Sequence, residues 1–240
     1  MRVVLVTGSS RGIGSCVARA FAEEKCRVVV HYRKEKSSAE AVAAGIRQSG
    51  GDVMTVQGDI SRSEEADAIV RRVVDAWGRL DVLVNNAALT RDRTILKMTD
   101  DEWNDVIQTN LSGTFWCLRA AARVMVKQKD GCIINLSSIV GVRGSFGGSN
   151  YSSSKAGVMG LTRSAARELG RFQVRVHAVL PGLHLTEMSR AAGEEYIESA
   201  RREHVLGKLT DTAELARFIV FLSQQKTISG QIYNFDSRIF

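Results

Sequence analysis

The fold of this chain is decided by the stretch Val3-Val4-Leu5-Val6-Thr7-Gly8-Ser9-Ser10-Arg11-Gly12-Ile13-Gly14. Its four apolar residues predict a buried strand, and helical spacing of apolar residues begins after the last glycine. Gly8 permits a tight turn, Gly12 lets the backbone approach a pyrophosphate, and Gly14 lets helix and strand pack closely. The N-terminus of the helix then offers N–H groups and a partial positive charge to phosphates. We therefore expect a dinucleotide to bind this turn through Gly8, Ser10, Arg11, Gly12, Ile13 and Gly14.

The same alternation of apolar runs and amphipathic segments continues to the C-terminus. We expect helices near residues 13–25, 37–49, 63–77, 100–127, 150–170 and 211–223, and further strands at 28–30, 53–57, 82–84, 132–136, 174–179 and 231–235. Continuous β-branched runs between helices predict a parallel sheet covered on both faces. Right-handed crossovers make this a doubly wound, Rossmann-like α/β fold. No linker or repeat interrupts the pattern, so we expect one domain over residues 1–240, with the irregular stretch from Pro181 to Gly207 as a substrate lid.

Composition excludes several classes of protein. The 44% apolar and 25% charged residues are ordinary for a soluble globular chain, and no apolar run is long enough to span a membrane. The first residues enter a strand without a signal-peptide cleavage region, and the four cysteines form no C-x-x-C pair, so we expect a cytoplasmic protein without a metal. The net charge of +7 indicates either a solvated basic surface, or an acidic partner or anionic substrate. Nucleic acid is the third and weakest alternative, since no binding motif for it is present.

A phenol and an amine lie four residues apart in Tyr151-Ser-Ser-Ser-Lys155. On a helix this spacing places both side chains on one face, one turn apart. Tyrosine normally titrates near pH ~10, and a nearby ammonium lowers that pKa toward the range of a general acid–base catalyst. The alternative is an exposed tyrosine beside a solvated lysine. The glycine turn and Asn135-Leu-Ser-Ser138 upstream favour the catalytic interpretation.

The end of the second strand bears on the choice of cofactor. A carboxylate there would bind the ribose 2′-hydroxyl of NAD, but His31, Tyr32, Arg33 and Lys34 include no acid. Arg11 in the glycine turn can reach the same region. These cations suit a 2′-phosphate, so NADPH is favoured over NADH, with an incidental basic loop as the alternative for Lys34 and, less so, for Arg33. We expect Tyr32 and Arg33 to contact the cofactor.

Together these motifs resemble the short-chain dehydrogenase/reductase family over nearly the whole chain. The sequences of three segments are most similar to those of the bacterial 3-oxoacyl-[acyl-carrier-protein] reductases: Arg91-Asp92, Glu102–Asp105 and Thr109–Leu111. The elements that match the family occur in its order: Thr7–Gly14, Gly58-Asp59-Ile60, Asn85-Asn86-Ala87, Asn110, Ser138, Tyr151-x-x-x-Lys155, and Pro181-Gly182 followed by Thr186.

The resemblance implies a role for each matched residue. Ser138 would hydrogen-bond the substrate carbonyl, Tyr151 would donate the proton as hydride arrives, Lys155 would lower the pKa of Tyr151 and hold the nicotinamide ribose, and Asn110 would anchor a water. Asp59 and Ile60 would flank the adenine. The remaining cofactor contacts implied by the family are Asn86, Ala87, Pro181, Gly182, His184 and Thr186.

The resemblance implies NADPH-dependent reduction of a 3-oxoacyl thioester. The alternatives are a reductase of another small carbonyl (an acyl-CoA, a quinone, a sugar or a polyketide intermediate) and a non-catalytic cofactor-binding regulator. Three departures from the family leave the substrate open: Ala88, His184 and Asp236-Ser237-Arg238. If the acyl group is carried on an acidic acyl carrier protein, we expect cations near the mouth of the active site. The candidates are Lys127, Lys129, Arg167 and Arg171. The alternative is that these four residues are solvated and only complement the dipoles of their helices.

The resemblance also implies a homotetramer, or a dimer if Ser237-Arg238 disturbs the C-terminal interface. The segments 100–127 and 150–170 carry more apolar residues than packing on one sheet face requires, and residues 232–235 with 239–240 offer a second apolar surface. The alternative is that these residues serve only the core of their own subunit. The surplus comprises Val106, Leu111, Phe115, Leu118, Ala122, Met125, Val158, Leu161, Ala165 and Leu169.

Overall fold

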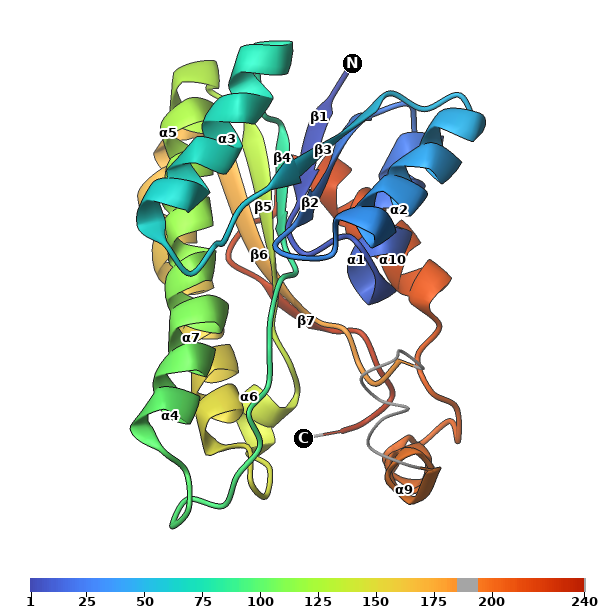
Figure 1. Cartoon of the computed structure of the whole chain (residues 1–240), viewed down its shortest axis with the longest axis vertical. Coiled ribbons are helices and arrows are strands. Elements are labelled where there is room, and N and C mark those ends of the chain that lie inside the picture. Colours follow the sequence, from blue (N-terminus) through green and yellow to red (C-terminus); the bar gives the residue numbers. More distant parts are fainter. Residues whose placement is uncertain (185–193, 240) are drawn as a thin grey trace.

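A computed structural model describes residues 1–184 and 194–239 of the protein. Within them the chain forms a seven-stranded sheet in the order β3-β2-β1-β4-β5-β6-β7, and all six neighbouring pairs are parallel (Figure 1). The predicted doubly wound α/β fold is therefore confirmed. The strands are β1 (Val3–Val6), β2 (Arg27–Tyr32), β3 (Val53–Gln57), β4 (Val82–Asn85), β5 (Gly131–Leu136), β6 (Val174–Leu180) and β7 (Ile232–Asn234).

Helices cover both faces of the sheet. One face packs against α1 (Gly12–Glu23), α2 (Lys36–Gln48) and α10 (Thr212–Gln224), and the other against α3 (Ser63–Trp77), α5 (Gly113–Gln128) and α7 (Ser149–Leu169) (Figure 1). Shorter helices lie toward the carboxyl ends of the strands: α4 (Asp100–Ile107), α6 (Val140–Arg143) and α9 (Glu194–Glu203). This layering explains the continuous apolar strands, since a parallel strand between two helical layers is buried on both sides.

Local sequence sets several helix ends. Thr99 accepts a hydrogen bond from the backbone of Glu102, whose carboxylate accepts one from the backbone N–H of Thr99, so a capping box begins α4. Asp211 caps α10 by accepting a hydrogen bond from the N–H of Glu214. Gly78 ends α3 in the left-handed conformation that glycine adopts without strain.

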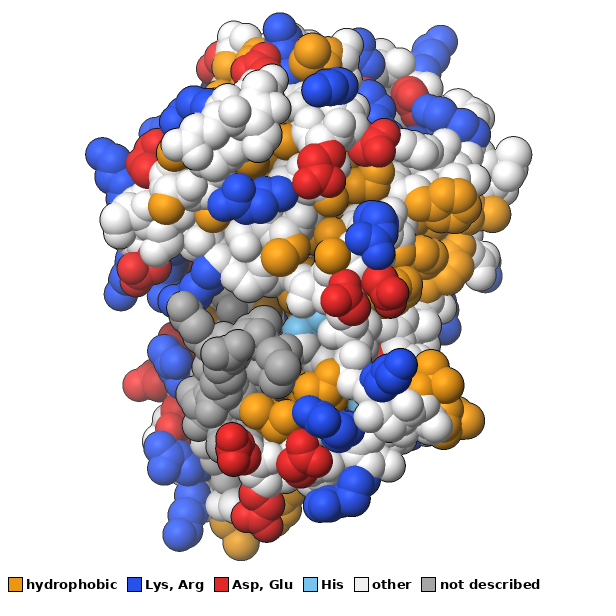
Figure 2. Space-filling view, turned by 90° about the vertical axis from the view of Figure 1, so that its right-hand side faces the viewer, with side chains coloured by type: hydrophobic (Ala, Val, Ile, Leu, Met, Phe, Trp, Pro, Cys, Tyr) orange, Lys and Arg blue, Asp and Glu red, His pale blue; other side chains and the backbone are white. Residues whose placement is uncertain are grey.

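The charges of the surface are mixed. Figure 2 shows Lys and Arg side chains interspersed with Asp and Glu over one face, rather than gathered into a single basic patch. Within residues 1–184 and 194–239, every helix is too short or too polar to cross a bilayer.

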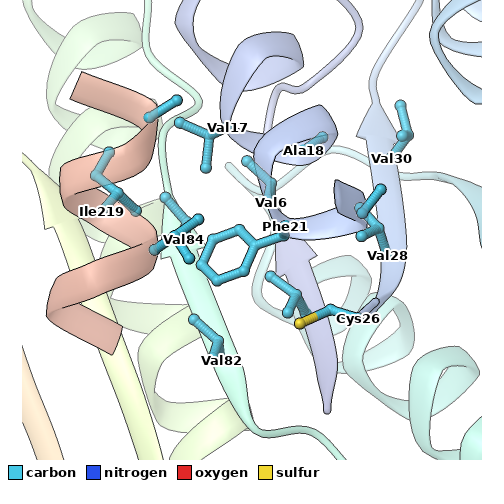
Figure 3. Packing of buried hydrophobic residues seen from close by; sticks show 14 of the residues in the cluster. Val6, Val17, Ala18, Phe21, Cys26, Val28, Val30, Val82, Val84 and Ile219 are labelled. Atoms are coloured by element: carbon cyan, nitrogen blue, oxygen red, sulfur yellow. The ribbon is translucent and has the colours of Figure 1, made fainter. Parts of the chain in front are cut away.

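The core beneath α1 and α10 is centred on Phe21, which is fully buried. Its ring lies among valines of β1, β2 and β4 and faces Ile219 of α10 (Figure 3). A second cluster on the opposite face joins α3, α5 and α7 to the same sheet. The two clusters hold the strand ends in fixed positions, and the candidate site is built on those ends.

The structure corrects two predicted elements and adds one that was not predicted. The helix expected over residues 100–127 is divided by a π-helical turn, Gln108–Ser112, between α4 and α5. The stretch from Pro181 to Gly207, expected to be irregular, contains α9, and the short α6 was not predicted. Periodicity could not reveal the π turn, because 3.6-residue spacing continues on both sides of it.

The apolar surplus is smaller than the sequence indicated. Phe115 alone of the ten residues is exposed, while Leu111, Leu161 and Leu169 are half-buried. The other six are buried within the subunit itself: Val106, Leu118, Ala122, Met125, Val158 and Ala165. The hydrophobic argument for an oligomer therefore rests on fewer residues, and the tetramer stays a prediction.

We expect Phe21→Ala to lower the free energy of unfolding by about 3–5 kcal/mol, because it leaves a ring-sized cavity in a region that secondary structure keeps from collapsing. Urea denaturation measures this change. Phe146→Ala is the matched control, since Phe146 is 95% exposed. The control should change stability by less than about 0.5 kcal/mol; equal effects of the two changes would contradict the assignment of Phe21 to the core.

Candidate active site

The carboxyl ends of β1, β4 and β5 meet at one edge of the sheet. The chain leaves β1 toward α1 on one face, whereas it leaves β4 toward α5 on the other face. This reversal makes a topological switch point between β1 and β4, where open α/β sheets bind their ligands.

Backbone conformation explains the glycines of the first turn. Gly8 has φ +62° and Gly12 has φ +56°, a region that other residues rarely adopt. A Cβ on Gly8 would lie 2.8 Å from Cα of Ala87, and one on Gly14 would lie 2.6 Å from the carbonyl oxygen of Gly8. The first turn of α1 contains no acidic residue, so the positive end of the helix is not neutralised from within. The backbone conformation expected of the turn is therefore present, and its contact with a pyrophosphate stays a prediction.

Thr7 and Asn86 hold this turn against β4. The hydroxyl of Thr7 accepts the N–H groups of Asn86 and Ala87 at 3.0 and 3.1 Å. The amide of Asn86 donates to the carbonyls of Thr7 and Gly8, both at 2.9 Å. Asn86 thus shapes the turn, a role that the sequence analysis did not assign, and its contact with the cofactor stays a prediction.

A hollow of about 410 Å³ opens beside the ends of β2 and β3. Within it Nη1 of Arg33 lies 3.6 Å from Oδ2 of Asp59. Burial would raise the pKa of Asp59, but hydrogen bonds from Ser61 and the nearby Arg33 outweigh it and lower that pKa. Arg72, on α3, also lines the hollow; it was not predicted because α3 is distant in sequence. The lining residues are Arg33, Lys34, Gln57, Gly58, Asp59, Glu65 and Arg72.

Tyr32 has a different position from the one predicted. Its side chain is 6% exposed and packs in the core with α1 and α2, and it does not line the hollow. Alternation along β2 places Tyr32 with Val28 and Val30 on the face that α1 and α2 cover. Arg33 and Lys34 follow the end of the strand, and they are the predicted cations that line the hollow.

Lys155 is the buried cation of the site. Its Nζ donates to the carbonyl of Leu136 at 2.7 Å and lies 5.6 Å from the centroid of the Tyr151 ring. The side chains therefore stack on one face of α7, as their spacing predicted. Burial lowers the pKa of Lys155 from 10.5 to about 8. The ammonium remains the main form at neutral pH, close enough to favour a phenolate.

Ser138 lies just beyond β5 and is half-buried at this edge, with its Oγ 3.4 Å from the backbone nitrogen of Val140. Asn150, which the sequence analysis did not single out, is fully buried beside Tyr151. Its amide donates to the carbonyls of Arg91 and Glu102, and its Oδ1 accepts the N–H of Tyr151. Asn150 thus fixes the start of α7, and with it Tyr151, against the β4–α4 loop and α4.

Asn110 lies in the π-helical turn and is fully buried. Its side chain accepts from the N–H of Leu89 and donates to the carbonyl of Leu89 and to Oγ of Ser154. The side chain is therefore occupied in joining the β4–α4 loop to α7. π turns inside helices are frequent at functional sites, but the predicted water at Asn110 stays a prediction.

The loop after β6 closes the site on the side of α10. The His184 ring is buried, with Nε2 at 2.6 Å from the carbonyl of Pro181 and Nδ1 at 3.1 Å from Oγ1 of Thr212. The ring therefore sets the shape of the loop, and a cofactor contact would use the backbone of Pro181, Gly182 and His184. Thr186 lies outside the described residues, as do Met188, Ala191 and Ala192 of the expected lid.

The C-terminal departure from the family forms a compact structure. The carboxylate of Asp236 is fully buried and pairs with Arg238 at 2.6 Å. The Ser237 carbonyl accepts the N–H of Val205, just beyond α9. The segment therefore supports the region next to the expected lid, and Arg238 supplies the cation that a buried carboxylate requires.

Four cations expected near the mouth of the site lie elsewhere in the subunit. Lys127 and Lys129 precede β5, and Arg167 and Arg171 precede β6. They therefore lie at the amino ends of these strands, about 15–20 Å from the carboxyl ends. The expectation assumed that the helix ends flank the mouth, whereas in a parallel sheet these helices end opposite to it.

Lys155 should make the stability of the ligand-free protein depend on pH. Below pH 8 the Lys155 amine is protonated in both the folded and the unfolded protein, and burial of the ammonium lowers the free energy of unfolding by on the order of 3 kcal/mol. Between pH of about 8 and 10.5 the amine loses its proton in the folded protein but keeps it in the unfolded chain, so stability rises with pH. Lys155→Met should therefore gain stability relative to the natural protein at pH 7 and lose that advantage by pH 10–11. Urea denaturation at both pH values measures the gap between the two proteins. The same change at Lys127, at the end of α5, is the control, and a gap for Lys155→Met that does not vary with pH would contradict the burial of an ammonium.

Comparison with known proteins agrees with this geometry. The profile of the family described as short chain dehydrogenase matches residues 2–197. The 3-oxoacyl-[acyl-carrier-protein] reductase FabG of Staphylococcus aureus is 43% identical over 229 residues, which are 95% of this chain and 93% of that protein. FabG of Staphylococcus epidermidis is 40% identical over 95% of this chain and 94% of its own length, and the 3-oxoacyl-[acyl-carrier-protein] reductase of Synechocystis is 40% identical over 98% and 95%. The chain therefore belongs to the short chain dehydrogenase family.

Proposed function

We propose that the protein reduces a 3-oxoacyl thioester, carried on an acyl carrier protein, to the 3-hydroxyacyl thioester with NADPH. One observation carries the chemistry: the ammonium of Lys155 is buried beside the ring of Tyr151, at the edge of the sheet that also holds the glycine turn. The names of the relatives, which match this chain over nearly its whole length, supply the substrate class.

Four residues of the site have separate roles in the proposed reaction. A bound nicotinamide supplies the hydride. The hydroxyl of Tyr151 donates a proton to the carbonyl oxygen, and the hydroxyl of Ser138 donates a hydrogen bond to the same oxygen. The Lys155 ammonium favours the phenolate that the proton transfer leaves behind. Asn150 keeps Tyr151 in place through the backbone at the start of α7.

The choice of NADPH is supported by the charges of the hollow. Three of its lining residues are cations, Arg33, Lys34 and Arg72, and guanidinium groups bind phosphate through charge-assisted hydrogen bonds. Asp59 stands opposite Arg33 and is the alternative acceptor for a ribose hydroxyl. A 2′-phosphate would compete with Asp59 for Arg33, and the other two cations favour the phosphate.

An acidic carrier protein is supported by the net charge of +7, which draws in an anionic partner over long range. Cations at the site end of the sheet lie on the β4–α4 loop, where Arg91, Arg93 and Lys97 are exposed. Arg91 and Arg93 also pair with Asp105 and Glu102. This loop is therefore a candidate surface for the carrier protein.

Two further features belong to the proposal. The protein would act as a homotetramer with dihedral symmetry, supported by the exposed Phe115 on α5 and the exposed Ile239; light scattering that finds only monomer would contradict this.

The cytoplasm suits the reaction, because it supplies NADPH and keeps thiols such as the four free cysteines reduced.

The substrate is tested by NADPH oxidation with acetoacetyl groups on acyl carrier protein and on CoA. We expect a higher kcat/KM with the carrier protein, and an advantage that shrinks as salt screens the attraction. Equal efficiency with both thioesters at low salt would remove the carrier protein from the proposal. Turnover with neither thioester would remove the substrate class.

Tyr151→Phe separates catalysis from binding in the same assay. It should lower kcat by about 100-fold or more, while the Kd for NADPH stays within about threefold, since the ring keeps its packing. Tyr233→Phe is the matched control, because Tyr233, on β7, packs against Phe218 of α10, on the face of the sheet opposite to α7. A Tyr151→Phe variant as active as this control would show that another group donates the proton.

Arg33→Ala should raise the Kd for NADPH about tenfold and change the Kd for NADH little, since one charge-assisted contact with the 2′-phosphate is lost. Fluorescence titration with each cofactor measures the ratio. Arg47→Ala, on the exposed side of α2, is the control. Equal loss for both cofactors would mean that Arg33 acts on the shared adenosine and not on the phosphate.

A further inference from the structure

His31 lies between the two halves of the proposed cofactor site. It is the penultimate residue of β2 and is 2% exposed. Its Nδ1 lies 3.0 Å from the backbone nitrogen of Gly8, in the glycine turn. Its Nε2 lies 3.0 Å from the carbonyl oxygen of Gly58, which lines the hollow beside β3. The imidazole of His31 therefore joins the glycine turn, where we expect the pyrophosphate, to the wall of the hollow beside β3, where we expect the adenosine.

The partners fix the protonation of the ring. The backbone N–H of Gly8 can only donate, so Nδ1 accepts, and Nε2 carries the proton that it donates to Gly58. The ring is thus neutral, in agreement with burial, which lowers the pKa of His31 to about 4. A protonated ring would set an N–H at Nδ1 against the N–H of Gly8.

The backbone of His31 makes separate bonds to the same turn. The N–H of Ser9 donates to the carbonyl of His31 at 2.9 Å, and the N–H of His31 donates to Oγ of Ser9 at 3.0 Å. Ser9 in turn donates to the carbonyl of Val6. These bonds do not involve the imidazole, so the strand keeps its attachment to the turn when the ring is replaced, and a substitution tests the ring alone.

The ring also has a consequence for ligand binding. Gly8 has a left-handed backbone and no side chain to restrain it, and its N–H is occupied by His31 instead of by a phosphate. The carbonyl of Gly58 is likewise held, next to Asp59, whose N–H binds Glu65. A site whose two halves are already fixed loses less conformational entropy when a ligand spans them.

We propose that His31 is a positioning residue that joins the glycine turn to the adenosine pocket and thereby sets the affinity for the dinucleotide. The inference rests on the proposed cofactor site and concerns binding, not the proton transfer at Tyr151.

Three substitutions separate the two bonds of the ring. His31→Phe keeps a planar ring and removes both hydrogen bonds. His31→Asn places an oxygen near the position of Nδ1, so it can accept from Gly8 but cannot reach Gly58. His31→Gln reaches the position of Nε2, so it can donate to Gly58 but not accept from Gly8. His177→Phe is the matched control, since His177 is a fully buried histidine on β6.

The experiment measures the Kd of NADPH and of 2′,5′-ADP by titration, kcat at saturating NADPH, and the melting temperature of each ligand-free variant. We expect His31→Phe to raise the Kd for NADPH about tenfold or more, with a smaller rise for 2′,5′-ADP, which occupies one half of the site and part of the pyrophosphate path. His31→Asn should recover most of the affinity because it restores the restraint on Gly8. His31→Gln should recover less of the affinity. The kcat of all three variants at saturating NADPH should stay within about twofold of that of the natural protein.

Several results would overturn the inference. A His31→Phe variant that melts earlier but binds NADPH as the natural protein does would make the ring a structural element only. If that variant does not fold, equal and unchanged affinities of His31→Asn and His31→Gln would lead to the same conclusion. A natural protein that binds no nicotinamide dinucleotide would overturn both proposals, whereas one that binds NADPH but reduces no thioester would overturn the substrate alone.

Discussion

The structure depends on the close approach of β1 and β4 where both strands end. The backbone of Gly8 lies so close to Ala87 that no side chain would fit between them. This contact brings the hydroxyl of Thr7 within hydrogen-bonding distance of the backbone just beyond β4. The chain turns to opposite faces of the sheet on either side of this point, so the cleft for a ligand opens here. A residue larger than glycine would separate the strands and remove the turn together with the cleft.

The site is held together by buried and half-buried polar side chains whose partners are mostly backbone groups. Asn86, Asn110 and Asn150 each use a side-chain amide to join segments that are distant in sequence. Such groups cost free energy when they lose a partner, so each one fixes the arrangement of its neighbours. The Lys155 ammonium is likewise satisfied by a backbone carbonyl, that of Leu136, and its burial destabilises the ligand-free protein while it places an ammonium beside Tyr151.

The two sides of the cleft are built differently. The cofactor side rests on β1 to β3 and on the core around Phe21, and its groups are fixed by short-range contacts. The opposite side is formed by the loop after β6, α9 and the C-terminal segment, where two of the three departures from the family occur. His184 and Asp236 are buried and paired there, so these departures are accommodated by the fold. The first side therefore holds the glycine turn, and two of the three departures from the family lie on the second.

Sequence alone determined the class of fold, the order of most elements and the pairing of Tyr151 with Lys155, because strand and helix periodicities are local and a four-residue spacing is local too. It also indicated the glycine turn, whose backbone requirements are carried by the glycines themselves. Only the tertiary structure decided that Tyr32 belongs to the core, that a π turn carries Asn110, and that four expected cations lie at the far end of the sheet. It also revealed Arg72, Asn150 and His31, whose partners lie on other elements. The physical reason is that a periodicity tells which face of an element is apolar, whereas the partner of a polar side chain depends on which distant segment packs beside it.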